Sequence, residues 1–169
     1  MPARKKKPTK STPRSRKSRA KRASSPAVAR RPAVAGRSGS LGKPAAAALV
    51  KVRRACLALP DTTEKIAWGS PTFRVNERLF VMFMDNHHGD GRLAIWCNAA
   101  PGAQEAFVTI DAESYFVPPY VGPSGWLGVR LDRTLAWSEV AARIGAAREA
   151  TLMSAEARRR RVRRSSSRP

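Results

Sequence analysis

Apolar side chains recur at helical spacing near residue 50. Intervals of three, four and three residues separate Leu49, Val52, Cys56 and Leu59. Side chains at this spacing lie on one face of an α-helix, where they can pack against a core. Prolines stand at positions 44 and 60, where they suit the first turn of such a helix and its end. The pattern therefore predicts a helix over residues 45–59.

The next part of the chain has the shorter period of β-strands. Phe73 and Val75 alternate with Thr72 and Arg74, as expected of a strand with one buried face. Asn76-Glu77 then forms a candidate two-residue turn. Residues 79–84 are apolar throughout, which indicates a central strand covered on both faces. Together with a short strand at 66–68 and a return strand at 92–97, these segments predict two consecutive antiparallel hairpins.

The remaining pattern predicts one more strand and two more helices. Residues 126–131 alternate again, with Trp126 and Arg130 on the same face. We expect a short helix over residues 101–109 and a last helix over about 136–153. The apolar stripe of the short helix consists of Ala103, Ala106, Phe107 and Ile110. That of the last helix consists of Trp137, Val140, Ala141, Ile144 and Ala147.

The charge of the chain is concentrated at its two ends. The 169 residues carry a formal net charge of +21. Residues 1–43 contain fifteen Lys or Arg and no acidic residue, and residues 155–169 contain seven Arg and one Glu. Residues 44–154 contain eleven basic and eleven acidic residues and are neutral. A large positive charge favours polyanions as partners, so nucleic acid is the leading partner class and an anionic membrane the second.

Aromatic residues mark the same boundaries. All eleven Trp, Tyr and Phe residues lie between Trp68 and Trp137. Highly charged segments without aromatic residues bury too little apolar surface to offset the entropy of ordering them. We therefore expect a disordered basic arm over 1–43, one folded domain over 44–154 and a disordered Arg-rich tail over 155–169. About 110 residues are enough for one core.

Several classes of protein are disfavoured. No run approaches eighteen apolar residues, so we expect no membrane span, and no apolar segment typical of a secretory signal follows the basic N-terminus. Cys56 and Cys97 lack metal spacing and are expected to be buried thiols. His87 and His88 adjoin a turn, but adjacent histidines cannot easily chelate one ion, so we expect a solvated loop there. No nucleophile, metal set or cofactor fingerprint is found, and we expect neither enzymatic activity nor a cofactor.

The N-terminal arm is the strongest functional signal in the sequence. Its basic residues occur in clusters separated by prolines. Such arms bind phosphates by releasing counterions, which gives affinity without base specificity. The alternative is a solubilising leader that has no particular partner. The candidate contacts are Lys5, Lys6, Lys7, Lys10, Arg14, Arg16, Lys17, Arg19, Lys21, Arg22, Arg30 and Arg31.

The C-terminal arginines are a second set of candidate contacts. They are Arg158, Arg159, Arg160, Arg161, Arg163 and Arg164. Like charges three and four residues apart weaken a helix in free solution. We expect this run to extend the last helix only when phosphate neutralises it. The alternative is a frayed, solubilising end.

Five residues of the neutral middle are further candidates for contact with nucleic acid. Arg74, Arg78 and Arg92 lie in or beside the predicted hairpins, and Trp126 and Arg130 share a strand face. An exposed aromatic ring beside a basic residue can stack on a base or approach a phosphate. The alternatives are that Trp126 packs beneath a helix and that the arginines are solvated ends of strands.

Three motifs in order resemble the MmcQ/YjbR-like family. The first runs from Leu59-Pro60 through Trp68-Gly69-Ser70-Pro71-Thr72-Phe73-Arg74-Val75 to Leu79-Phe80-Val81. The second is Phe116-Val117-Pro118-Pro119-Tyr120-Val121-Gly122. The third combines Gly125-Trp126-Leu127-Gly128-Val129 with Trp137-Ser138-Glu139-Val140. The resemblance covers about residues 46–150 and includes neither basic end.

This resemblance implies a compact α+β domain of the CyaY-like kind, in which helices pack on one side of an antiparallel sheet. It also implies two hairpins that form a double wing proposed to bind DNA. Relatives often carry a basic residue where this chain has Ser124, and Lys where it has Asn98. Both differences remove positive charge from that surface, so we expect the basic ends to supply most of the affinity.

The sequence thus favours a monomeric, non-enzymatic DNA-binding protein of the bacterial nucleoid. Its basic tails would contact phosphates without sequence preference, and the domain would position them. The alternative is a protein- or small-ligand-binding module that its tails localise to nucleic acid, including RNA or ribosomes. A continuous positive face containing Arg74, Arg78, Arg92 and Arg130 would favour the first hypothesis. A deep apolar pocket near Trp68, Tyr120 and Trp126 would favour the second.

Overall fold

The structure, a computed structural model, describes the backbone of residues 42–166 and the side chains as far as Arg163. Six strands form a single antiparallel sheet in the order β1-β2-β3-β4-β6-β5. The strands are β1 (Thr62–Ala67), β2 (Ser70–Val75), β3 (Arg78–Asp85), β4 (Leu93–Cys97), β5 (Tyr115–Phe116) and β6 (Leu127–Arg130). The helices are α1 (Lys43–Leu57), α2 (Ala103–Ile110) and α3 (Trp137–Ser166). This architecture confirms the predicted α+β class.

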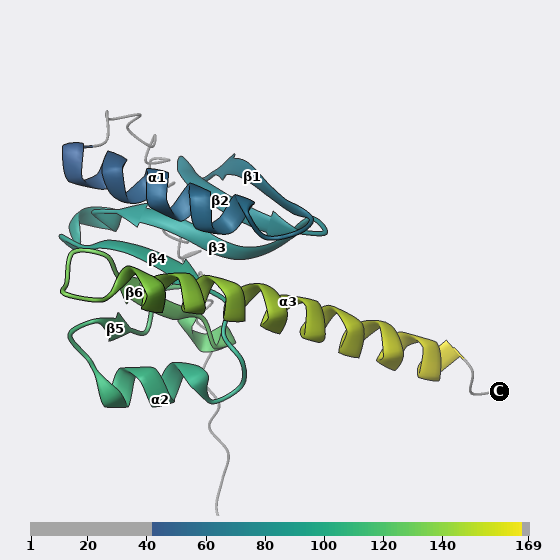
Figure 1. The fold of residues 1–169 in the computed structure, drawn as a ribbon. Coiled ribbons are helices and arrows are strands. Elements are labelled where there is room, and N and C mark those ends of the chain that lie inside the picture. Colours follow the sequence, from purple (N-terminus) through teal and green to yellow (C-terminus); the bar gives the residue numbers. More distant parts are fainter. Residues whose placement is uncertain (1–41, 167–169) are drawn as a thin grey trace, which may run out of the picture. The chain divides into compact units, whose positions relative to one another are not determined.

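One face of the sheet carries the helices (Figure 1). Leu49, Val52 and Cys56 of α1 and Ile144 of α3 are buried in one cluster with the inward side chains of the strands. Phe107 of α2 is partly buried against the same cluster. The expected stripes of α1 and α3 therefore form the core, and the helices do lie on one side.

The opposite face of the sheet buries a second, smaller cluster. It consists of Met82, Met84, Ala94, Trp96 and Phe116, with Leu79, Val121 and Trp126 partly buried against it. Because β3 contributes side chains to both clusters, the prediction of a strand covered on both faces is confirmed.

The β2–β3 hairpin combines a tight turn with an irregularity. Asn76 and Glu77 have φ values of 49° and 62°, as the predicted two-residue turn requires. Phe73 pairs with Val81 but the next residue of β2 pairs with Leu79, so Phe80 has no partner in β2. An extra residue of this kind reverses the alternation of side chains. As a result Leu79 joins the second cluster, and Arg78 lies on the face that carries α3.

The structure corrects three details of the predicted pattern. Ala106 and Ile110 of α2 are exposed rather than buried, because α2 lies at the β5 edge of the sheet and contacts it mainly through Phe107. His87 is not a fully solvated loop residue, since its ring packs edge-on against Trp96 at 4.7 Å. The third correction concerns α3, which continues to Ser166 instead of ending near residue 153.

The expected disorder of the C-terminal tail is therefore wrong for residues 155–166, which are helical. Neither Gly nor Pro interrupts the chain between Ala146 and Ser166, and arginine is among the better helix formers. Glu156 also pairs with Arg160 one turn later at 2.6 Å, in the orientation that stabilises a helix. These contributions oppose the repulsion between arginines.

None of the described helices is both long enough and apolar enough to cross a membrane.

Candidate nucleic-acid interface

The candidate contacts of the N-terminal arm, from Lys5 to Arg31, lie outside the described residues. The interface that the structure does describe begins with the C-terminal part of α3. Ala155 is the last buried residue among the described side chains of this helix, with 8% of its surface exposed. Every residue from Glu156 to Arg163 is exposed. We call residues 156–166 the arginine extension.

The arginine extension is continuous with a helix that the core holds firmly. Ala147, Ala150 and Thr151 are buried against the sheet. The hydroxyl of Thr151 accepts a hydrogen bond of 2.8 Å from the amide of Asn98, just beyond β4, and donates one of 2.9 Å to the carbonyl of Ala147. Figure 1 shows the end of α3 running past the sheet. At a rise of 1.5 Å per residue, the eleven residues of the extension span about 16 Å.

Arginines surround the extension on all sides. Arg158, Arg159, Arg160 and Arg161 are consecutive, and successive side chains on a helix are about 100° apart. Arg160 pairs with Glu156. Within the described residues, Arg158, Arg159 and Arg161 have no carboxylate partner. Arg163 is exposed, and the side chain of Arg164 lies outside the described part. An exposed helix of this kind presents guanidinium groups in several directions at once.

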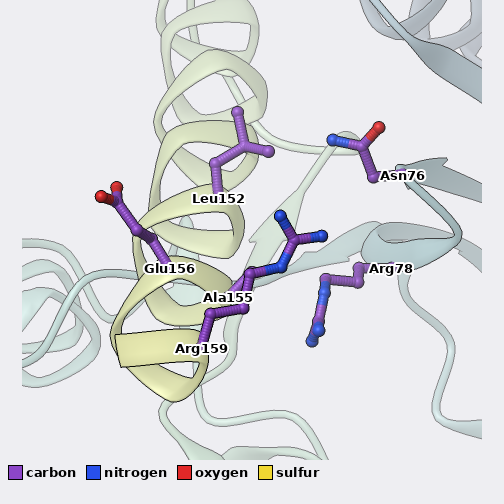
Figure 2. A pocket seen from close by; sticks show the side chains of 6 residues that line it. All are labelled: Asn76, Arg78, Leu152, Ala155, Glu156 and Arg159. Carbon is purple, nitrogen blue, oxygen red and sulfur yellow. The ribbon is translucent and has the colours of Figure 1, made fainter. Parts of the chain in front are cut away.

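A groove joins this extension to the β2–β3 hairpin. It has a volume of about 390 Å³ and is lined by Asn76, Arg78, Leu152, Ala155, Glu156 and Arg159. Figure 2 shows the Arg159 side chain reaching from the helix toward Asn76, while the Arg78 side chain comes from the hairpin and points toward the other end of the groove. The structure thus brings together two arginines that were predicted separately, one in the core and one in the tail.

The other candidate residues of the core lie elsewhere, and their charges are partly compensated. The guanidinium of Arg130 donates hydrogen bonds of 3.0 and 2.7 Å to the Asp132 carboxylate. These bonds raise the pKa of Arg130 and lower the pKa of Asp132. Arg92 lies over the ring of Phe116 at 4.4 Å, in a groove that the carboxyl-bearing residues Asp85 and Asp132 also line.

Arg74 and Trp126 are held by contacts within the domain. Arg74 donates a hydrogen bond of 3.3 Å to the carbonyl of Glu77 in the hairpin turn. Trp126 is partly buried against the second cluster, and its carbonyl accepts a hydrogen bond from the side-chain amide of Gln104. Because Arg78 lies on the opposite face from the second cluster, no single face presents all four core arginines.

Two of the three aromatic residues near which a deep apolar pocket would favour the alternative hypothesis are largely exposed. Trp68 is 78% exposed at the turn between β1 and β2, and Tyr120 is 75% exposed. Both have positive φ, 52° and 65°, which is uncommon for large side chains. The ring of His87 lies 6.1 Å from that of Tyr120, and burial lowers the pKa of His87. Among the residues that the structure describes, no three His, Cys, Asp or Glu side chains gather as a metal site.

Sequence reasoning missed the groove because two of its features have no simple pattern. The extra residue Phe80 determines on which face Arg78 lies, and nothing in the apolar run 79–84 marks it. From sequence, Asn76 is recognisable only as a turn residue. Ala155 and Arg159 are one helical turn apart, which places them on the same face of a helix. This spacing indicates a shared surface only once the helix is known to continue past residue 153.

Over residues 42–166, these features define a small α+β fold with a six-stranded antiparallel sheet, three α-helices on one face and a basic helical extension. The YjbR family model matches residues 57–150, more than half of the chain. The chain therefore belongs to the YjbR family. The match ends before the arginine extension begins, so the extension lies outside the part shared with the family.

A solved structure is also similar to this chain. It is the crystal structure of protein DR2400 from Deinococcus radiodurans, which contains a DUF419 domain. The two chains are 18% identical, with a TM-score of 0.49, and the match covers 57% of this chain and 72% of the other. A comparison with curated proteins finds no match.

Proposed function

We propose that this protein binds duplex DNA without sequence preference, as a non-enzymatic component of the bacterial nucleoid. The phosphates of DNA would be contacted by the basic arm and by the arginine extension of α3. The YjbR domain would act as the scaffold that holds the extension in place.

The observation that carries this proposal is the exposed arginine extension. Its eleven residues contain six arginines and one glutamate, and the described side chains all face solvent. An α-helix fits the major groove of B-DNA, where phosphates line both sides. Arginines that point in several directions from such a helix can reach phosphates on both strands.

The absence of sequence preference follows from the kind of side chains present. Phosphate contacts fix a protein on the duplex but carry no sequence information. The extension contains no Asn or Gln to read adenine. Because its six basic residues are all arginine, they present the same donors at every position and cannot select a particular series of bases. We therefore expect affinities for unrelated duplexes of equal length to agree within about threefold, much less than the preference of specific binders.

The test uses the full-length protein and two charge variants. In one, Arg158, Arg159, Arg160, Arg161, Arg163 and Arg164 are replaced by Gln. In the other, the twelve candidate contacts of the arm are replaced by Gln. We expect each variant to bind a fluorescent 30-base-pair duplex more weakly than the wild type in anisotropy titrations. Wild-type affinity in either variant, or failure of the wild type to bind, would overturn the proposal.

A further inference from the structure

The groove between the β2–β3 hairpin and α3 is shaped by two features of the hairpin and one of the helix. The turn at Asn76-Glu77 ends β2, and the unpaired Phe80 turns Arg78 toward α3. On the helix, Ala155 is small and buried, so the hairpin can approach closely. Arg159 stands one turn further along the same face of α3. Two arginines from separate elements, the hairpin and the helix, therefore line one groove.

The charges in this groove are not balanced by the protein. Among the described residues, neither Arg78 nor Arg159 pairs with a carboxylate. The groove also contains Glu156, but this side chain is engaged with Arg160. Figure 2 shows its carboxylate pointing away from both guanidinium groups. Two like charges that share a groove repel each other, and an anion between them would remove that repulsion.

The groups that line the groove are suited to a phosphate. A guanidinium offers parallel N–H donors that match two oxygens of one phosphate. The side-chain amide of Asn76 is a further donor at the hairpin end of the groove. One lining residue, Arg159, belongs to the exposed arginine extension, which favours a phosphate that belongs to a polyanion over an isolated one.

We propose that this groove holds one backbone phosphate of the DNA strand, and that it thereby fixes the direction in which the arginine extension crosses the duplex. The inference rests on the proposed function, because the phosphate belongs to the same DNA. It adds a defined contact from the YjbR domain, through Arg78, to those made by the helix. The domain would then be part of the binding surface as well as a scaffold.

Four full-length variants test this contact. R78Q and R159Q each remove one side of the groove. R161Q removes the same charge from the opposite side of the same helix, since two residues correspond to about 200°. R54Q removes an exposed arginine of α1, which has no carboxylate partner within the described residues and lies outside the groove. R159Q, R161Q and R54Q are each also combined with R78Q, so that the coupling between the two positions in their effect on DNA affinity can be measured.

We expect R78Q and R159Q each to weaken duplex binding by about tenfold, the scale of one charge-assisted hydrogen bond, and R54Q by less than about twofold. Because Arg78 and Arg159 would share one phosphate, the R78Q/R159Q double variant should lose less than the product of the single losses. R78Q/R161Q should lose the full product, since those residues would contact separate phosphates.

A second readout separates the sources of phosphate. The Nε–H resonances of Arg78 and Arg159, assigned from the two single variants, are followed by NMR during titration with the duplex and with inorganic phosphate. Shifts of both resonances with the duplex support the proposal. If inorganic phosphate saturates the groove while R78Q binds DNA as R54Q does, the groove serves a small phosphate ligand and the proposal is overturned.

The outcomes also separate this inference from the proposed function. If the wild type binds DNA but R78Q matches R54Q, the groove contact is overturned and DNA binding by the extension stands. If the six-arginine variant binds as tightly as the wild type, both are overturned. Circular dichroism spectra identical to the wild type establish that each Gln variant is folded.

Discussion

The side-chain amide of Asn98 donates a 2.8 Å hydrogen bond to the hydroxyl of Thr151 and so fastens α3 to the end of β4. Thr151 is buried, and this contact lies one turn before Ala155, where the helix leaves the core. The two residues are 53 positions apart in the sequence. This hydrogen bond therefore ties α3 to the sheet close to the point where the arginine extension begins.

Replacing Thr151 with Val keeps the shape of the side chain but removes the hydroxyl, and leaves the Asn98 amide without this partner. We expect T151V to lower the free energy of unfolding by about 1–3 kcal/mol. The matched control is T109V, because Thr109 is exposed in α2. Urea denaturation measures both variants, and equal stabilities would show that the Asn98–Thr151 bond contributes nothing.

Two glycine substitutions should have opposite effects. A Cβ on Gly128 of β6 would lie 2.4 Å from the ring of Phe116. Arg92 also lies over this ring at 4.4 Å, and the ring cannot move without changing that contact, so G128A should destabilise the fold by about 1–3 kcal/mol. Gly145 has open space around it within α3, and G145A should stabilise the fold by about 0.5–1 kcal/mol. Thermal unfolding shows whether each variant is more or less stable than the wild type. A G145A variant that is less stable would contradict the packing described for α3.

The elements that sequence predicted well are those with a local cause. The stripe of α1, the turn at Asn76-Glu77 and the apolar strand β3 each follow from spacing or from residue type. The family resemblance supplied the placement of the helices on one side. These features need no information about distant contacts.

The features that sequence missed depend on the balance between distant or competing interactions. The sequence indicates no partner for Arg130, whereas in the structure its guanidinium pairs with the Asp132 carboxylate. The exposure of Ile110 reflects the position of α2 beside the short edge strand β5. The length of α3 depends on two opposing effects. Helix propensity and the Glu156–Arg160 ion pair favour the helix, and repulsion among the arginines opposes it. The sequence alone does not decide which of them is stronger.

The two thiols should be inert in the folded protein. Cys56 and Cys97 are 0% and 1% exposed, and burial raises the pKa of each, to about 12 for Cys97. A thiolate is the reactive form, so a thiol-specific disulfide reagent at pH 8 should label neither residue until the protein unfolds. Both should react at once in concentrated denaturant. Rapid labelling of the native protein would contradict the burial of both thiols in the core between the helices and the sheet.

The helical form of the extension should matter for binding, beyond its charge. Proline in a helix interior removes a hydrogen bond and clashes with the preceding turn. Ala157 is exposed, so A157P should leave the cooperative unfolding of the core almost unchanged but redirect the arginines that follow. We expect about tenfold weaker duplex binding, measured by anisotropy. The control is A157S, and wild-type affinity in A157P would show that the extension acts as a flexible polycation.

The salt dependence of DNA affinity tests the central claim most directly, because it measures phosphate contacts. The logarithm of the association constant is plotted against the logarithm of salt concentration for the wild type and for the variant with six Arg→Gln changes in the extension. Each lost phosphate contact reduces the slope by about 0.9, so the account predicts a slope shallower by at least about 2. Parallel lines with the same affinity would contradict it.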